Sequence, residues 1–193
     1  MAKYFLFIFL SLIANAASAQ VIVNIQWQGE KSGYAGDTIF YDAAYKLKWN
    51  DFKGRPDAAS SAAAITQSGF GYNMSMQSYN NLTNININVF CYFSKNRSWV
   101  KKDMKTDYAL EHEQHHYDIT YINTCLFIQK LKQARLTQSN FNAVVEKIYD
   151  ECFVALNEMQ DKYDGETSNG RIEGVQFAWN KKINEKLATL TTN

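Results

Sequence analysis

The three histidines of the chain all lie within one short stretch, ALEHEQHHYDIT, residues 109–120. His112, Glu113 and His116 form the pattern His-Glu-x-x-His. Residues four apart lie on the same face of an α-helix, so the two imidazoles can bind one metal ion. Zinc accepts imidazole nitrogen, and a catalytic zinc site uses three protein ligands and leaves a fourth position for water. The stretch therefore predicts a zinc site with His112 and His116 as ligands.

Glu113 and His115 occupy different positions around the same helix. Glu113 is next to the first ligand, where its carboxylate can take a proton from a water that attacks a carbonyl. We therefore predict that Glu113 is the catalytic general base. His115 lies about 100° around the helix from His116, which disfavours it as a further ligand. The alternative interpretation of the whole stretch is a solvated polar face without a metal.

Three amphipathic helices are expected in the second half of the chain. Residues 106–136 contain no Gly or Pro, and their apolar residues recur at helical spacing. The stretch LTQSN interrupts this pattern, and a second helix is predicted from about residue 140 to about residue 163. After the polar loop GETSNG, a third helix is predicted over residues 172–187. The short connection between the first two helices predicts an antiparallel pair.

This helix pair indicates where a third ligand should be sought. If Cys125 and Cys152 lie opposite each other and form a disulfide, the chain reverses between residues 138 and 139. In an antiparallel pair that reverses there, the residue opposite His112 is at position 165 and the residue opposite His116 is at position 161. Asp118 is disfavoured because it is two residues from His116 and therefore points away. The favoured third ligand is Asp164, and the other carboxylates within reach are Asp161, Glu166 and, more weakly, Glu158.

The first half of the chain is predicted to form strands. Residues 84–93, NININVFCYF, alternate apolar and polar side chains with the period of a half-buried strand, and Cys91 belongs to the packing face. Residues 70–79 are its expected hairpin partner across the turn-like NNLTN. The predicted fold class is therefore α+β: an N-terminal antiparallel sheet packed against a long helical hairpin that carries the His-Glu-x-x-His motif, plus a third helix.

The N-terminus predicts export. Lys3 precedes an apolar run that ends in Ala17-Ser18-Ala19, the small-x-small pattern of a signal peptide cleaved after Ala19. Residues 20–193 then form a single domain, periplasmic or extracellular, with no membrane insertion after cleavage. A formal net charge of +1 gives no general attraction for nucleic acid.

Four motifs together resemble a known family. LKWNDFKG, SWVKK, HEQHHYDIT and YDGETSNG resemble the bacterial family catalogued as domain of unknown function 922, described as predicted secreted zinc-dependent proteases. The resemblance covers about residues 45–183 and implies a zincin-like metallopeptidase domain. The family usually has Gly where this chain has His115, and often has His where it has Asn169. The resemblance therefore adds Asn169 to the candidates for the third ligand.

Two classes of function follow from the sequence. In the first, the protein is a metalloprotease, a hydrolase that cleaves a peptide or protein substrate with Glu113 and zinc. In the second, the same fold is a non-catalytic binding or adaptor module of the cell envelope. Substitution of Glu113 distinguishes the two, because only an enzyme needs a general base.

Overall fold

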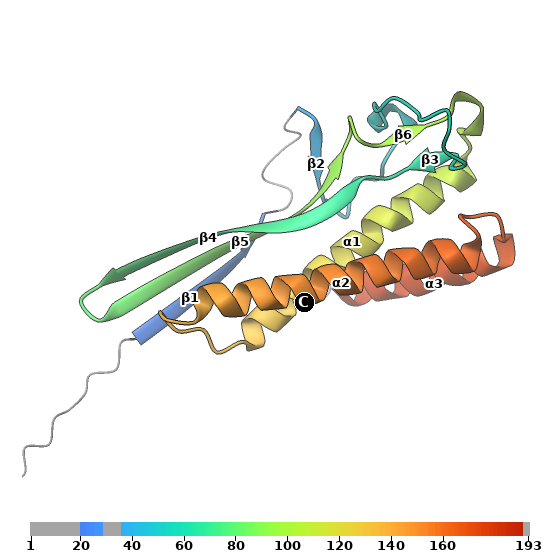
Figure 1. The fold of residues 1–193 in the computed structure, drawn as a ribbon. Coiled ribbons are helices and arrows are strands. Elements are labelled where there is room, and N and C mark those ends of the chain that lie inside the picture. The colour runs from blue at the N-terminus through green and yellow to red at the C-terminus, as the bar shows by residue number, and fades with distance from the viewer. Residues whose placement is uncertain (1–19, 29–35, 191–193) are drawn as a thin grey trace, which may run out of the picture.

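The computed structural model describes residues 20–28 and 36–190 (Figure 1). The predicted signal peptide, residues 1–19, lies outside the described residues. Within them, strands occupy the N-terminal half and three helices the C-terminal half, which confirms the predicted α+β class.

The main sheet is built around one long strand, β5 (Leu82–Ser94). β4 (Ser68–Tyr79) pairs antiparallel with β5 along its whole length, and β2 (Thr38–Phe40) pairs antiparallel with its last residues. β1 (Gln20–Trp27) pairs with the first part of β5 in parallel. The sheet is therefore mixed, whereas the sequence suggested an antiparallel one, because no tight turn fixes the direction of β1.

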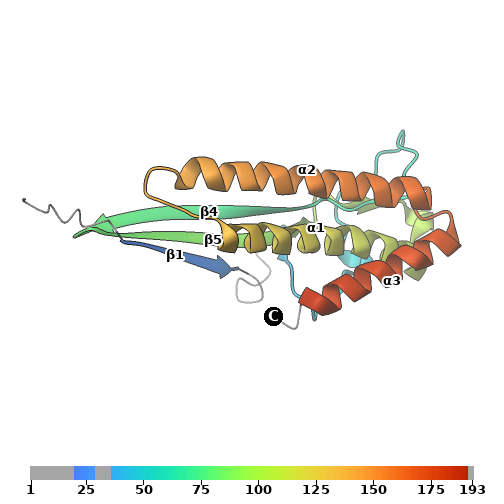
Figure 2. The same cartoon turned by 90° about the horizontal axis from the view of Figure 1, so that it is seen from below.

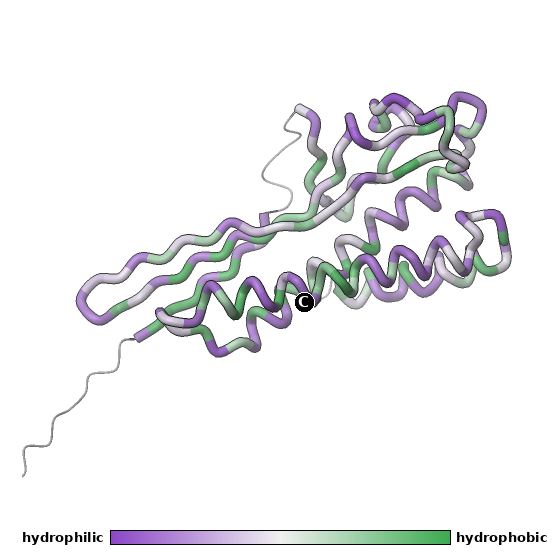
Figure 3. Tube along the Cα trace, viewed as in Figure 1, coloured by the Kyte–Doolittle hydropathy of each residue, from purple (hydrophilic) through white to green (hydrophobic). Residues whose placement is uncertain are grey.

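The sequence of β5 explains why it lies at the centre. Its apolar residues alternate with asparagines (Figure 3), and five successive alternate side chains, from Ile85 to Phe93, are completely buried. The predicted hairpin with β4 is confirmed. Its turn places Asn80 and Asn81 at φ values of 47° and 63°, a left-handed conformation that asparagine tolerates well.

α1 (Asp107–Gln133) and α2 (Phe141–Thr167) lie against the apolar face of the sheet, and α3 (Glu173–Leu190) packs against these two helices (Figure 2). α1 contacts the sheet, α2 and α3, so it is the central helix of the domain. Thr106 caps its N-terminus by accepting a hydrogen bond from the N–H of Ala109. No helix in the described ranges is long and apolar enough to cross a membrane.

Short elements complete the end of the domain near the N-terminus of α1. β3 (Ala64–Ile65) and β6 (Trp99–Val100) form a separate two-stranded sheet. Two 3₁₀ turns, Trp49–Asp51 and Lys102–Met104, lie in the connections. β3 continues almost directly into β4, so residues 62–68 form an extended segment above α1.

The antiparallel pairing of α1 and α2 has the predicted register. Lys130 of α1 forms an ion pair with Glu151 of α2, and nearer the other end the backbone carbonyl of His116 accepts a hydrogen bond from Gln160. The reversal therefore falls close to the point between residues 138 and 139. α2 is one turn longer than predicted and includes Asp164, because the Thr167 hydroxyl bonds to the Tyr163 carbonyl within the last turn.

The predicted Cys125–Cys152 disulfide is wrong, since all three cysteines carry free thiols. Asn123 of α1 contacts Met159 of α2, and Cys125 lies about 200° farther around the helix. Cys125 therefore points away from α2, and it lies close enough to Cys91 in β5 to raise the pKa of the Cys91 thiol. The register of the helices was right, but the face on which Cys125 lies was not.

We expect the native protein to contain three free thiols of low reactivity. Cys91 and Cys152 are completely buried, and burial raises the pKa of all three thiols, which keeps the reactive thiolate form scarce. Titration with a thiol reagent should be slow in the folded protein and should give three thiols in denaturant without reductant. Peptide mapping that finds a Cys125–Cys152 link would contradict this packing of α1.

Candidate metal centre

The predicted motif lies on the face of α1 that is turned toward α2. His112 and His116 are one helical turn apart, and their Nε2 atoms are 3.2 Å from each other. Both imidazoles are largely buried, with side-chain exposures of 9% and 13%. The motif is therefore buried and does not lie on a solvated face.

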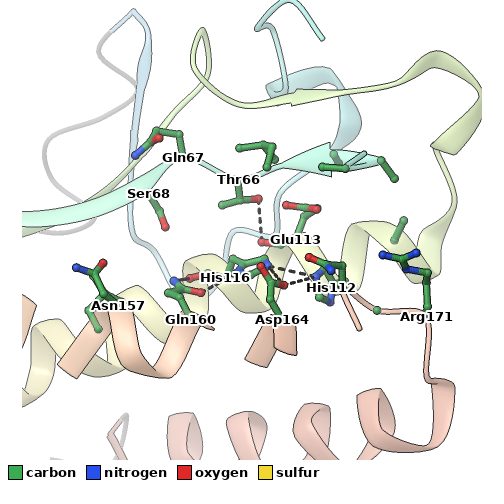
Figure 4. A pocket seen from close by; sticks show the side chains of 18 of the residues that line it. Thr66, Gln67, Ser68, His112, Glu113, His116, Asn157, Gln160, Asp164 and Arg171 are labelled. Carbon is green, nitrogen blue, oxygen red and sulfur yellow. Dashed lines mark hydrogen bonds and ion pairs between the residues drawn. The ribbon is translucent and has the colours of Figure 1, made fainter. Parts of the chain in front are cut away.

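Asp164 approaches both histidines from the last turns of α2. Its Oδ1 atom lies 3.1 Å from Nε2 of His112 and 3.1 Å from Nε2 of His116. The structure thus brings together the three residues that the sequence selected as ligands (Figure 4). The three atoms form a nearly equilateral triangle, and the group could hold a metal ion.

Two glutamines determine which nitrogen of each histidine faces Asp164. Nδ1 of His112 lies 2.8 Å from Oε1 of Gln176, and Nδ1 of His116 lies 2.5 Å from Oε1 of Gln160. Each amide oxygen accepts a hydrogen bond, so the Nδ1 atoms carry hydrogens and the Nε2 atoms face into the triangle, where they can bind a proton or a metal ion. Neither glutamine was singled out in the sequence.

The orientation of the two glutamines is itself fixed. The amide nitrogen of Gln160 donates to the His116 carbonyl at 2.8 Å and to the Thr120 hydroxyl at 3.3 Å. The amide nitrogen of Gln176 donates to the Tyr163 hydroxyl and to Asn180. The Tyr163 ring also stacks on His112, with ring centroids 4.7 Å apart. These contacts leave the glutamine oxygens as the groups that face the histidines.

The triangle has an electrostatic consequence. Two nitrogen lone pairs and a carboxylate oxygen repel one another at 3.1–3.2 Å unless a positive charge lies among them. Burial lowers the pKa of His116, but its hydrogen bond to Asp164 and the nearby charges of Glu113 and Asp164 outweigh this effect and raise the pKa to about 9. Burial raises the pKa of Asp164, but the hydrogen bonds from both histidines hold it well below its usual value. A positive charge is therefore favoured within the triangle, and a metal ion could supply it.

Glu113 lies beside the triangle, in the wall of a cleft of about 470 Å³. Its side chain is only 6% exposed, and its Oε2 atom has no hydrogen-bond partner among the described residues. A buried carboxylate without a partner costs free energy, which is characteristic of functional groups. Residues from α1, α2, the extended segment 62–68 and the loop 169–171 line the same cleft (Figure 4).

The other candidate ligands lie outside the triangle. Glu158 and Asp161 are exposed on other faces of α2. Glu166 accepts a hydrogen bond of 2.8 Å from the indole of Trp179. Asn169 lines the cleft after the end of α2, but its side chain is exposed, and its backbone N–H binds the Asp164 carbonyl. None of these side chains contacts the two histidines in the structure.

His115 points away from the triangle, in agreement with its predicted position about 100° around α1 from His116. Its Nδ1 atom lies 3.2 Å from the fully buried carboxylate of Asp118. Asp118 also accepts hydrogen bonds from the Tyr41 hydroxyl and the Gln114 amide, each 2.9 Å long. The amide oxygen of Gln114 accepts a hydrogen bond from the backbone N–H of Leu47. This network anchors α1 to residues 41–47.

Comparison with known proteins gives no further guidance. No family model, curated protein or solved structure matches the chain. The resemblance drawn from the four sequence motifs therefore stays a prediction.

Substitutions in the triangle should remove metal binding selectively. We expect the protein to bind about one divalent ion per chain, and His112→Ala, His116→Ala and Asp164→Ala each to lose it, because two remaining ligands hold an ion poorly. Asp161→Ala is the matched control, since it removes an exposed carboxylate one turn earlier in α2. Elemental analysis after dialysis measures the ion content. Stoichiometric metal in the His112→Ala/His116→Ala double variant would rule out this site.

Metal affinity should increase with pH. Because the pKa of His116 is raised to about 9 in the metal-free protein, a proton occupies the site at neutral pH and has to leave when the ion binds. The affinity should therefore rise about tenfold per pH unit from pH 7 and level off as the pH passes through 9. Chelator competition measures this slope, and calorimetry in two buffers of different ionisation enthalpy counts the released protons. A flat profile would show that Nε2 of His116 does not bind the ion.

Proposed function

We propose that the protein is a zinc-dependent peptidase in which His112, His116 and Asp164 bind zinc and Glu113 is the general base. The observation that carries this proposal is the triangle of two Nε2 atoms and one carboxylate oxygen next to a buried, unpartnered glutamate in one cleft. Peptidases that use the His-Glu-x-x-His motif require this combination of groups.

The donor set and its spacing support zinc as the metal. Ligands 2.0–2.1 Å from a tetrahedral zinc ion are about 3.3–3.4 Å from one another. The three donor atoms here are 3.1–3.2 Å apart, so small movements suffice to accommodate the ion. Calcium and magnesium prefer sites made of oxygen atoms, whereas two of these donors are imidazole nitrogens.

The position of Glu113 supports hydrolysis. When bound, zinc supplies a Lewis acid that polarises a carbonyl and makes a nearby water more acidic. Glu113 can accept the proton of that water, because one oxygen of its carboxylate has no competing partner among the described residues. It can then pass the proton to the leaving amine. Its location within the cleft keeps bulk water from this path.

The extended segment 62–68 supports a peptide as the substrate. The carbonyl of Ala63 accepts a hydrogen bond from Lys101, and the backbone of Gln67 bonds to Ser94 and Ser98. Backbone groups of successive residues in a strand point to opposite edges, so those of Ala64 and Thr66 point the other way. The segment lines the cleft, and an extended peptide can add to such an edge as a further strand.

The predicted export suggests where the substrate is found. If the signal peptide is cleaved after Ala19, the enzyme acts in the periplasm or outside the cell. Its substrate is then a peptide or protein of that compartment.

Replacing Glu113 should separate catalysis from structure. Glu113→Gln keeps the shape of the side chain but cannot accept a proton, so peptide hydrolysis should fall by about 10²- to 10⁴-fold. Zinc content and melting temperature should remain close to those of the wild type. Cleavage of an unstructured peptide library, followed by mass spectrometry, measures the loss.

Two controls accompany this experiment. Chelation should stop the same cleavages and added zinc should restore them, while Glu166→Gln, which changes a carboxylate outside the triangle, should leave turnover in place. If the wild type binds zinc but cleaves nothing in the library, or if Glu113→Gln is as active as the wild type, the peptidase proposal is wrong. A non-catalytic binding module of the envelope would then be the better interpretation.

A further inference from the structure

The cleft has a direction that follows from two contacts between segment 62–68 and α1. The Thr66 hydroxyl donates to the Glu113 carbonyl at 3.1 Å, and the Ser68 hydroxyl lies 2.7 Å from that of Thr120. Residue numbers therefore increase in the same direction along the segment and along α1. The Ala62 end of the segment consequently lies toward the N-terminus of α1, and the Ser68 end toward its middle.

At the Ala62 end, the loop after α2 is held against the metal centre. The Tyr108 hydroxyl donates to the Gly170 carbonyl at 2.6 Å, and the Gly170 N–H donates to Thr167. Gly170 has a φ of 77°, and a Cβ there would lie 3.3 Å from Nδ1 of His112. The backbone can approach the imidazole this closely only because residue 170 is glycine. The position of the next residue, Arg171, is therefore well defined.

Arg171 brings a positive charge to this end of the cleft. It is the only lysine or arginine among the described residues that line the cleft. Its Nε atom donates to the Ser168 carbonyl at 2.9 Å, which fixes the plane of the guanidinium. Its two terminal amino groups have no protein partner in the described part of the chain. Figure 4 shows Arg171 beyond His112, on the side opposite to Gln160 and Asn157. A guanidinium whose two terminal amino groups have no protein partner can bind a carboxylate through two parallel hydrogen bonds.

The other end of the cleft carries two apolar side chains beside polar ones. Phe153 and Leu156 of α2 line it, and the Phe153 side chain is 45% exposed. Because α2 runs antiparallel to α1 and Gln160 reaches Thr120, residues 153–156 lie beyond the Ser68 end of the segment. An exposed aromatic side chain in a cleft offers a contact surface for an apolar group.

From these contacts we propose that Arg171 is a specificity residue that binds a carboxylate of the peptide on the C-terminal side of the scissile bond. The proposal rests on the proposed function, in which a peptide lies along segment 62–68. Antiparallel pairing, which is the more stable arrangement, directs the C-terminal part of the peptide to Arg171 and its N-terminal part to Phe153 and Leu156. The carboxylate is an Asp or Glu side chain or a free C-terminus.

Binding to an inactive protein tests this proposal without relying on turnover. The probes are dye-labelled heptapeptides that share an apolar N-terminal half, measured by fluorescence polarisation with zinc-loaded Glu113→Gln protein. One arm compares an internal Glu with Gln in C-terminally amidated peptides. The second compares a free with an amidated C-terminus in peptides that lack acidic side chains. The arm that shows a difference identifies the source of the carboxylate.

We expect the carboxylate peptide to bind about 10- to 100-fold more tightly than its amide partner, as is typical of a charge-assisted pair. Introducing Arg171→Glu into the Glu113→Gln protein should abolish this preference, and introducing Arg171→Lys should keep part of it. The matched control is Arg135→Glu, which makes the same charge change on an exposed residue next to the connection between α1 and α2. Melting temperatures verify that each variant is folded.

The possible outcomes distinguish this proposal from the proposed function. Equal affinity for carboxylate and amide peptides in both arms, a preference that persists in Arg171→Glu, or no binding of any probe overturns the role of Arg171. If the wild type cleaves peptides while Arg171→Glu leaves binding preferences unchanged, the peptidase stands and the specificity residue does not. If carboxylate peptides bind through Arg171 and the wild type cleaves none of them, the carboxylate site stands and the catalytic proposal fails.

Discussion

Two imidazole nitrogens and a carboxylate oxygen meet within 3.2 Å of one another, an arrangement that is favourable only when a positive charge, a proton or a metal ion, lies among them. Gln160 and Gln176 turn the Nε2 atoms of the two histidines inward, so the triangle could hold a metal ion. On the opposite face of α1, the hydrogen bonds to the buried Asp118 carboxylate hold the helix to residues 41–47. These bonds hold α1 in one rotational position, which keeps His112 and His116 directed toward Asp164.

Much of the fold is encoded in short-range patterns, and those parts were predictable. The alternation of residues 84–93 identified β5 and its buried face, and the helical periodicity of the second half identified all three helices. The direction of β1 was not predictable, because its partner lies far away in the sequence and no turn joins them. The end of α2 was placed too early, since GETSNG resembles a loop while the Thr167 side chain stabilises another helical turn.

The candidate site was only partly predictable, for a geometric reason. In an antiparallel helix pair, facing residues are related by reflection through the turn, and this relation led from His112 and His116 to Asp164. This relation predicts the level of a residue along the helix axis but not the side of the helix on which its side chain lies. For this reason the predicted Cys125–Cys152 disulfide was wrong. Gln160 lies one turn before Asp164 on the same face of α2 and could have been found in this way. Gln176 follows three consecutive residues of positive φ, which no periodic pattern could anticipate.

The facing turns of α1 and α2 also determine where the chain can vary in length. His112 and His116 are four residues apart, and so are Gln160 and Asp164, which contact them. One residue inserted between Gln160 and Asp164 would rotate the carboxylate by about 100° and shift it by about 1.5 Å, so the two contacts could no longer form together. The connection at residues 134–140 lies at the far end of the pair and is free of this constraint. In an evolving lineage, insertions and deletions should therefore accumulate in that connection, while these two helical turns remain free of gaps.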